Sequence, residues 1–283
     1  MFYPYKYFSP LSRGKILFGL QGKWYMENEM EQVQVGLMLP GSKPFNDNKN
    51  INPTYKSHVK THDGVTQAYV KLIPYREIYV ECVCGVIGRF LGLPIPKPLI
   101  VKVDHESLDS IEPGRFILAF GSEDSVYPSL KRRGLNEYLI KKLEDFSQTL
   151  DIGVFDEWIA NPDRHGGNIL FDGSDNFTFI DHGLSIPEDL SFDAPARANI
   201  IVEQLYKIKS EFEKYKTNRE AQSTISPMYS DIPISLVSEK TYATSYLTSD
   251  EVVSVISFLK ERSKELNSLF EKRLDLNQKG LAL

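Results

Sequence analysis

The sequence predicts an α+β chain in two lobes, with strands first and helices after. Runs rich in β-branched and aromatic residues, bounded by Gly, Pro, Asn and Asp, fill most of the first 130 residues. From about Leu135 onward, apolar residues recur at the spacing of an amphipathic helix. A short hairpin pattern at residues 169–171 and 177–180 interrupts this helical part. Strands and helices segregated along a chain in this way are typical of the α+β class.

The size and composition of the chain indicate a folded, acidic protein. Its 283 residues are 41% hydrophobic and 12% aromatic, enough for a large core in one or two domains of about 150 residues. The 33 basic and 38 acidic residues give a net charge of −5, which disfavours a dedicated nucleic-acid-binding protein. No apolar run reaches about 18 residues, and the N-terminus lacks the apolar core of a secretory signal. We therefore expect no membrane span and a cytoplasmic location.

The two cysteines, Cys82 and Cys84, are separated by one residue. This spacing cannot provide the four ligands of a zinc site, and no second cluster of Cys and His completes one. We therefore expect two reduced, buried thiols that pack as small apolar side chains.

The strands expected in the N-terminal part alternate with turn signals. A polar loop crowded with Gly, Asn, Asp and Pro occupies residues 40–53, and residues 62–64 form a turn. After Pro74 the apolar period becomes helical over residues 79–91, with Gly92 as the C-terminal cap. The strands are expected at residues 14–25, 31–39, 54–61, 68–73, 99–103 and 115–120.

Amphipathic spacing predicts the helices of the C-terminal part. One helix begins near Leu135, and a second ends within residues 155–160. Two further helices are expected at residues 197–216 and 249–274, with an irregular Ser/Thr/Pro-rich segment between them. The helix that begins near Leu135 carries an apolar stripe formed by Leu139, Leu143, Phe146 and Leu150.

Residues 155–185, FDEWIANPDRHGGNILFDGSDNFTFIDHGLS, carry the groups that point to chemistry. Asp163 precedes Asn168 by five residues in a loop rich in Pro and Gly, and Asp181 follows Asn168 by thirteen. The expected hairpin between them would return Asp181 to the side of that loop. Two carboxylates and a carboxamide around one cleft offer the oxygen ligands that Mg²⁺ takes beside phosphates. The alternative is that Asp, Asn and Gly serve here only as loop formers.

The run WIANPDRHGGNIL followed by FIDHG resembles the catalytic and metal-binding loops of HipA-like kinases and of phosphatidylinositol 3-/4-kinases. The resemblance covers about residues 30–215. It implies a two-lobed protein-kinase-like fold, with a β-rich N-lobe at residues 1–121 and a mainly helical C-lobe at residues 122–283. It also implies ATP and Mg²⁺ as cofactors and transfer of the γ-phosphoryl group to a hydroxyl.

The same resemblance implies roles for individual residues of the loop. Asp163 matches the catalytic Asp, and Asn168 and Asp181 match the metal ligands. His165 matches the histidine that these families carry in the loop, and we group it with the catalytic residues. In the kinase template the catalytic Asp accepts the proton of the acceptor hydroxyl.

Lys71 stands in an otherwise apolar strand, AYVKL, and Glu81 follows ten residues later in a largely apolar helix. A lysine in such a strand is either a solubility device on a sheet edge or a lysine that binds nucleotide phosphates. A carboxylate in an apolar helix needs a partner, which favours a pair between Lys71 and Glu81. The run VECVCGVIGRFLGLPIPKPLIV resembles the same segment of HipA-like kinases. Glu77, one helical turn earlier, is the competing partner.

A kinase N-lobe would make residues 40–53 the phosphate loop, with Gly41, Ser42 and Lys43 as nucleotide contacts. This loop departs from the G-x-G-x-x-G pattern because it has one glycine rather than three. The alternative is an ordinary surface loop. The strand at residues 115–120 would then be the hinge that offers backbone groups to adenine, which places Phe120 among the expected cofactor contacts.

The acceptor is less defined by the sequence. A protein Ser or Thr is favoured by the resemblance, an inositol lipid is the second choice, and a nucleotide-binding pseudokinase that serves as an interaction module is the alternative class. Transfer of AMP or another group by a kinase fold also stays open. The basic triplet Lys131, Arg132 and Arg133 is either a solvated face or a contact for an acidic partner or a lipid head group. We expect a structural role for His182 and a core position for Trp158.

Overall fold

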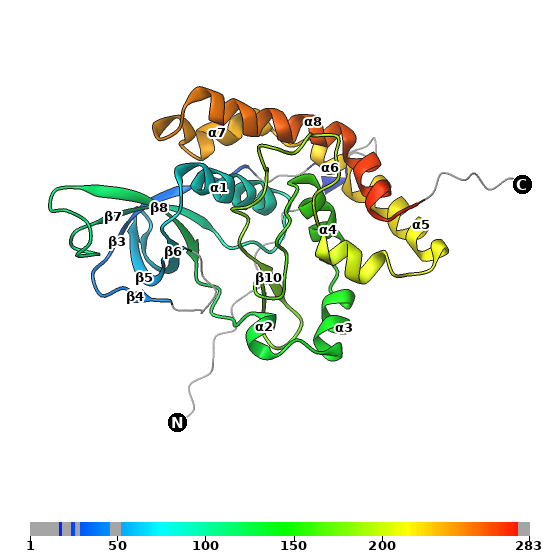
Figure 1. Cartoon of the computed structure of the whole chain (residues 1–283), viewed down its shortest axis with the longest axis horizontal. Helices are drawn as coiled ribbons and strands as arrows, with labels where there is room; N and C mark the ends of the chain where they lie inside the picture. The colour runs from blue at the N-terminus through cyan, green and yellow to red at the C-terminus, as the bar shows by residue number, and fades with distance from the viewer. Residues whose placement is uncertain (1–16, 19–23, 26–28, 46–51, 277–283) are drawn as a thin grey trace, which may run out of the picture.

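The computed structural model describes residues 17–18, 24–25, 29–45 and 52–276. It is a mixed α/β structure with a sheet-rich N-terminal part and a helical C-terminal part (Figure 1). The main sheet has the order β3-β7-β8-β6-β5-β4, and β3 also pairs with β5, so that five of its strands close on themselves. Its strands are β3 (Gln34–Met38), β4 (Lys43–Pro44), β5 (Thr54–Thr61), β6 (Gly64–Lys71), β7 (Pro98–Asp104) and β8 (Phe116–Glu123).

The strands expected from the sequence are confirmed, with three corrections. β6 begins at Gly64, four residues before the start expected at residue 68, and ends at Lys71 rather than at residue 73. β8 continues to Glu123, because its last residues pair with both β6 and β7, whereas we expected the strand to end at Phe120. β4 lies inside the polar loop expected at residues 40–53 and pairs with β5. Of the hairpin arm expected at residues 14–25, β1 (Leu17–Phe18) pairs with β2 (Trp24–Tyr25), and the remainder lies outside the described residues.

α1 (Tyr75–Phe90) follows β6 directly and begins after Pro74, whose ring cannot donate a backbone hydrogen bond. It ends at Leu91, and Gly92 then adopts a φ of +75°, a conformation that favours glycine. The helix is buried along most of its length, between the sheet and α7 (Val237–Lys240). Cys82 and Cys84 are both buried in it, and this burial raises the pKa of each thiol.

The first helices of the C-terminal part differ from the single apolar stripe predicted for them. α3 (Glu137–Asp145) carries Leu139 and Leu143, while Leu150 belongs to α4 (Thr149–Trp158). The chain breaks between them because Phe146 takes an extended conformation, with ψ of 124°. α4 ends where the sequence predicts. The buried Trp158 at its end donates from Nε1 to the Leu259 carbonyl at 3.2 Å, as expected of a core position.

The helix predicted at residues 197–216 is also divided. A π-helical turn, η1 (Val202–Tyr206), is followed by a break at Ser210. Ser210 then caps α5 (Glu211–Glu220) in a capping box with Glu213. The segment expected to be irregular at residues 217–247 is instead made mainly of short helical turns. These are the end of α5, η2 (Ala221–Ile225), α6 (Pro227–Ser230), η3 (Ile234–Leu236), α7 and η4 (Ala243–Ser245).

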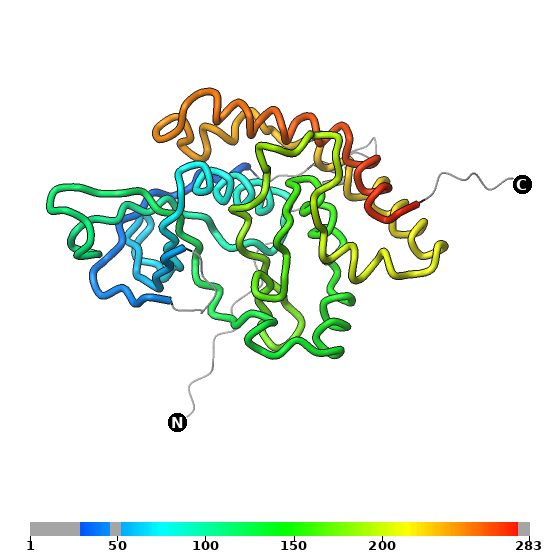
Figure 2. The backbone as a smooth tube through the Cα atoms, in the orientation of Figure 1, coloured from blue at the N-terminus to red at the C-terminus, as the bar shows by residue number. Residues whose placement is uncertain are grey.

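The C-terminal segment returns to the N-terminal part. α8 (Ser249–Arg273), confirmed as a long helix, packs on α4, and α7 contacts α1. Figure 2 shows the orange segment, which contains α7 and the start of α8, above the cyan helix. The Val33 amide donates to the Lys240 carbonyl at 2.9 Å, which joins the two parts directly. No helix within the described ranges is both long and apolar enough to span a membrane.

Candidate active site

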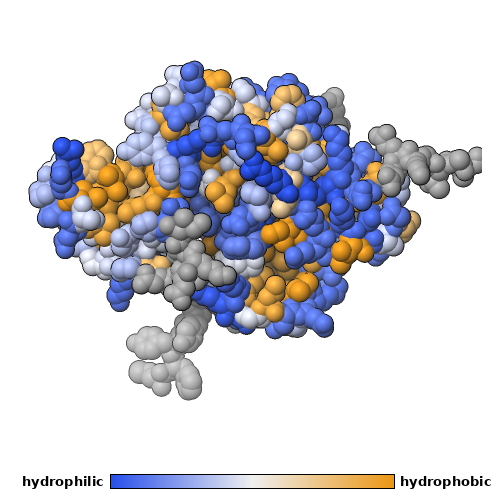
Figure 3. Space-filling view, in the orientation of Figure 1, coloured by the Kyte–Doolittle hydropathy of each residue, from blue (hydrophilic) through white to orange (hydrophobic). Residues whose placement is uncertain are grey.

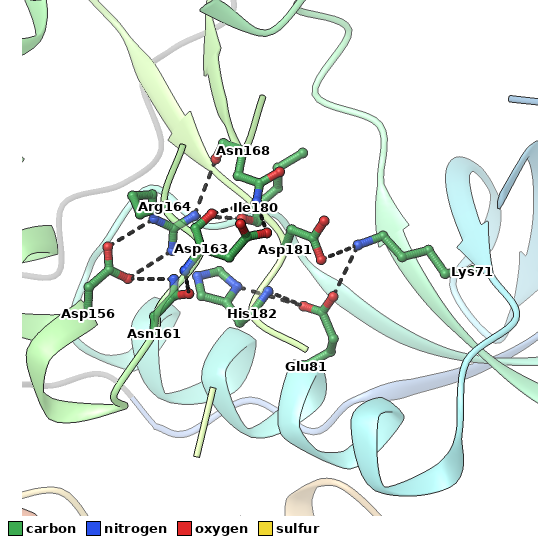
Figure 4. Close-up of polar contacts among 10 residues, drawn as sticks. All are labelled: Lys71, Glu81, Asp156, Asn161, Asp163, Arg164, Asn168, Ile180, Asp181 and His182. Atoms are coloured by element: carbon green, nitrogen blue, oxygen red, sulfur yellow. Dashed lines mark hydrogen bonds and ion pairs between the residues drawn. The ribbon is translucent and has the colours of Figure 1, made fainter. Parts of the chain in front are cut away.

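Three segments far apart in the sequence meet at Lys71, the last residue of β6. Its Nζ lies 3.2 Å from Glu81 Oε1 on α1 and 2.7 Å from Asp181 Oδ1, which follows the hairpin of β9 (Ile169–Phe171) and β10 (Phe177–Phe179) (Figure 4). The Lys71 side chain is 19% exposed and that of Glu81 is 2% exposed. The expected pair of Lys71 and Glu81 therefore forms, and the structure adds Asp181 to it.

The charges of this cluster stabilise one another. Burial alone would lower the pKa of the Lys71 amine, but the carboxylates of Glu81 and Asp181 hold it above its usual value. Burial also opposes ionisation of Glu81. The Lys71 charge, together with the ring and the backbone N–H of His182, nevertheless holds the pKa of this carboxyl well below its usual value. Lysine and glutamate are consequently both charged at neutral pH.

The competing carboxylate, Glu77, is not bonded to Lys71. It lies one helical turn before Glu81, and burial together with the charges of Glu81 and Asp181 raises its pKa. The second oxygen of Glu81 instead accepts the backbone N–H of His182 at 2.9 Å. Glu81 thus holds Lys71 with one oxygen and the residue after Asp181 with the other.

The loop between α4 and β9 places Asp163 and Asn168 together. Asn168 Nδ2 donates to the Asp163 carbonyl at 2.8 Å and to Asp163 Oδ2 at 3.1 Å. The Gly167 amide donates to Nδ1 of His165 at 3.0 Å, so this ring nitrogen acts as an acceptor. That Nε2 lies 3.9 Å from Asp163 Oδ1. The five-residue spacing read from the sequence therefore converges on one point.

Asn168 and Asp181 offer a donor set that suits Mg²⁺. The side-chain nitrogen of Asn168 donates to Asp163, which leaves the side-chain oxygen, Oδ1, as the group for a cation. The backbone N–H of Ile180 donates to the backbone carbonyl of Asn168 at 3.1 Å. This bond holds Asp181, the residue after Ile180, beside Asn168. No group of three or more His, Cys, Asp or Glu side chains in the described segments could hold a metal. Mg²⁺ bound with nucleotide needs only one or two protein oxygens beside phosphates, so these residues fit it.

Phe120, the expected nucleotide contact on β8, lies beside Lys71. Phe120 is opposite Lys71 in the pairing of β6 and β8, and Lys71 Nζ is 6.0 Å from its ring centre. The loop at residues 40–53 ends beside Lys71, because the Pro53 carbonyl accepts the amide of the next residue, Leu72, at 2.9 Å.

The structure does not join the expected phosphate-loop residues to this cluster. Lys43 pairs with Lys56, two strand positions from the Thr54 that pairs with Lys71, and Gly41 is exposed with a φ of +85°. Among the described residues, no hydrogen bond or ion pair joins Gly41, Ser42 or Lys43 to the cluster. Their contact with phosphates stays a prediction.

Sequence reasoning missed three buried polar residues behind the loop. Asp156, Asn161 and Arg164 are at most 1% exposed and bond to one another (Figure 4). The signal available in the sequence was an acidic pair, Asp156 and Glu157, inside an otherwise apolar helix end, IGVFDEWIA. Two carboxylates in such a setting require buried partners.

Comparison with protein families decides the relationship of the chain. The family model of HipA-like kinases matches residues 60–264, which include Lys71, Glu81, Asp163, Asn168 and Asp181. The chain belongs to the HipA-like kinase family. The match extends further toward the C-terminus than the resemblance noted in the sequence. It begins after the loop at residues 40–53 and so does not bear on that loop.

Other comparisons add little to this membership in the HipA-like kinase family. A search of curated proteins found no match. Among solved structures, the chain is similar to the crystal structure of the Helicobacter pylori proinflammatory kinase CtkA. The two share 14% sequence identity with a TM-score of 0.49, over 85% of this chain and 96% of that chain.

Proposed function

We propose that this HipA-like kinase transfers the γ-phosphoryl group of ATP, with Mg²⁺, to a Ser or Thr hydroxyl of a protein. The observation that carries the proposal is the meeting of Lys71 with both Glu81 and Asp181, next to the bonded pair of Asp163 and Asn168. This arrangement supports a two-lobed protein-kinase-like fold, with the division after residue 121 and the nucleotide between the lobes.

Each residue has a separate part in the proposed reaction. Lys71 binds the nucleotide phosphates and Glu81 orients it. Asp163 accepts the proton of the acceptor hydroxyl through Oδ1, since Oδ2 is bonded to Asn168. The acceptor oxygen forms a bond to the γ-phosphorus, the bond from that phosphorus to the β–γ bridging oxygen breaks, and ADP leaves. His165, whose Nε2 lies 3.9 Å from Asp163 Oδ1, is the group proposed to orient that carboxylate.

Asn168 and Asp181 would hold the magnesium ion, which when bound neutralises charge on the phosphates. Asp181 has a φ of +66°, in the left-handed region that Asp and Asn tolerate better than most residues. This conformation directs its carboxylate to Lys71 while its neighbour His182 turns into the core, where the ring is 2% exposed.

Label transfer tests the reaction class. The purified protein would be incubated with γ-labelled or α-labelled ATP, Mg²⁺ and acceptor proteins. Transfer of the γ-label to an acceptor, with no transfer of the α-label, supports a kinase reaction. Transfer of the α-label would identify transfer of AMP instead, and tight nucleotide binding without any transfer would identify an interaction module.

The acceptor surface favours an acidic protein segment. α2 (Leu130–Arg133) lies against the catalytic loop, because the Lys131 amide donates to the Gly166 carbonyl at 2.9 Å. Lys131, Arg132 and Arg133 are all exposed; Arg132 lies over the Phe45 ring, and Arg133 Nε donates to the Phe171 carbonyl. Figure 3 shows hydrophilic and hydrophobic residues side by side at the lower edge, where Figure 1 places α2 and α3. The cations of α2, whose backbone contacts Gly166 three residues after Asp163, favour carboxylates beside the acceptor hydroxyl.

Peptides test this preference directly. Ser-containing peptides flanked by Asp and Glu should be phosphorylated faster than the same peptides flanked by Lys. Lys131→Glu should reverse the preference while leaving the KM for ATP unchanged, since Lys131 is proposed to contact the acceptor only. Equal rates for both peptides would contradict an acidic acceptor. Phosphorylation of phosphatidylinositol vesicles, with no label on any peptide, would contradict a protein acceptor.

A further inference from the structure

We propose that three residues, Asp156, Asn161 and Arg164, form a buried hub. This hub positions the proposed base, Asp163, and the two proposed metal ligands, Asn168 and Asp181. The hub rests on the proposed function, but none of its members reaches the nucleotide or acceptor. They are positioning residues, and they act through the backbone of the two loops that carry Asp163, Asn168 and Asp181.

The hub is centred on the Asp156 carboxylate at the end of α4. Oδ2 accepts Arg164 Nε at 3.0 Å, and Oδ1 accepts Arg164 Nη2 at 3.0 Å. The same Oδ1 accepts Asn161 Nδ2 at 2.9 Å. A two-pronged Arg–carboxylate pair fixes the plane of the guanidinium as well as its position.

From this centre, one contact reaches each functional segment. Asn161 Oδ1 accepts the backbone N–H of Asp163 at 3.0 Å. Arg164 Nη1 donates to the Asn168 carbonyl at 3.3 Å and to the Ile180 carbonyl at 2.6 Å. Ile180 directly precedes Asp181. The hub therefore sets the position of the proposed base through Asn161 and of both proposed metal ligands through Arg164.

Only arginine can make this set of contacts. Lysine presents one point charge, so it could stay near Asp156 but could not also reach the two carbonyls that Nη1 contacts. The arrangement also separates two effects. Loss of Asn161 releases only Asp163, whereas loss of the Arg164 fork releases the two metal-ligand segments.

Arg262, which bonds to the residues at the end of α4, provides a matched control. Glu157 is as buried as Asp156 but faces away from the catalytic loop and binds Asn199 and Arg273. Arg262, fully buried like Arg164, donates to the carbonyls of Glu157 and Trp158. Arg262→Lys therefore removes a buried guanidinium that holds backbone carbonyls, as Nη1 of Arg164 does, without touching either metal-ligand segment.

The test measures melting of the full chain with ATP at increasing Mg²⁺. Arg164→Lys should raise the Mg²⁺ concentration that gives half of the ATP-dependent increment by about 10- to 100-fold, the usual effect of losing a group that orients a metal ligand. Arg262→Lys should lower the melting temperature of the free protein but leave this concentration within about twofold of wild type.

A second variant covers the case in which Arg164→Lys does not fold. Asn161→Ala should lower kcat by about 10²-fold through misplacement of Asp163, with the KM for ATP and the magnesium requirement unchanged. Wild-type kcat in Asn161→Ala, or a wild-type magnesium requirement in folded Arg164→Lys, would show that the hub is scaffold only. A wild-type protein with no magnesium-dependent increment would instead overturn the proposed function, and the hub with it.

Discussion

Glu81 divides its two carboxylate oxygens between Lys71 and the backbone of His182, so it serves both sides of the site. If Lys71 and Glu81 act as one unit, Lys71→Ala and Glu81→Ala should each impair transfer, and the double variant should be little worse than either. Steady-state kinetics of the three proteins measures this. Losses that multiply would show that the two residues act independently, and Glu77→Ala serves as the control on the same helix.

Asp151, in the first turn of α4, gives a prediction about pH. Burial raises the pKa of this carboxyl to about 6, with a further contribution from the Glu220 charge. Because the folded pKa exceeds the unfolded one, the folded state loses stability as the pH rises from about 4 to about 6, where only the unfolded state gives up the proton. The penalty is constant above about pH 6, and below about pH 4 both states hold the proton. Asp151→Asn should therefore stabilise the protein by about 1–3 kcal/mol at pH 8.

Chemical denaturation across pH 4.5 to 8 measures this gain, which should stay level from pH 8 to about pH 6 and shrink as the pH falls further. A gain that is constant over the range would show that Asp151 is not the source of the penalty. The variant lies on α4 well before Asp156 and should leave transfer activity near that of wild type.

At the scale of elements, the contact between α1 and β7 sets the position of Glu81. Gly85, one turn after Glu81, faces the Pro98 ring, and a Cβ at Gly85 would lie 2.9 Å from Pro98 Cγ. A proline ring cannot rotate away, so Gly85→Ala should displace α1 and lower the free energy of unfolding by about 1–3 kcal/mol.

The same variant should weaken ATP-dependent stabilisation, because the displaced helix carries Glu81 away from Lys71. Cys84→Ala, a buried substitution on the same helix that removes volume, should lower stability without this loss. If Gly85→Ala keeps the full response to ATP, the helix position does not control the site.

Strands and helices were predictable to different degrees. The strand at residues 54–61 and the first arm of the later hairpin matched the prediction, because turn residues bound them on both sides. The helix breaks at Phe146 and Ser210 were missed, since neither carries Gly or Pro and both depend on tertiary packing and capping. The short turns after Glu220 lack a periodic stripe, so no single-sequence pattern announces them.

At the scale of the whole molecule, the site was more predictable than the scaffold behind it. The meeting of Asp163, Asn168 and Asp181 was predictable because their spacing follows a recognisable motif, while their roles stay predictions. Arg164 and Asp156 escaped because a buried ion pair has no local sequence pattern, and its partners are decided by the fold. The phosphate loop stays a prediction because its sequence departs from the glycine-rich pattern.

Catalysis and binding should separate cleanly at Asp163. Asp163→Asn should lower phosphoryl transfer by about 10²- to 10⁴-fold, because the variant lacks a base for the acceptor proton. It should still bind Mg·ATP, since Asp163 is proposed to contact the acceptor rather than the nucleotide. Single-turnover kinetics and nucleotide binding measure the two effects, and wild-type turnover would remove Asp163 from the catalytic role.

The most direct test of the account is the magnesium-dependent stabilisation of Asp181→Asn by ATP. Ligand at about 100 times its dissociation constant stabilises a protein by about 2.7 kcal/mol, which shifts its melting visibly. Wild type and Asp163→Asn should show the increment, and Asp181→Asn should lose most of it while its free form melts near wild type, because Asn keeps the shape and tolerates the positive φ. A full increment in Asp181→Asn would place the metal elsewhere and contradict the account at its centre.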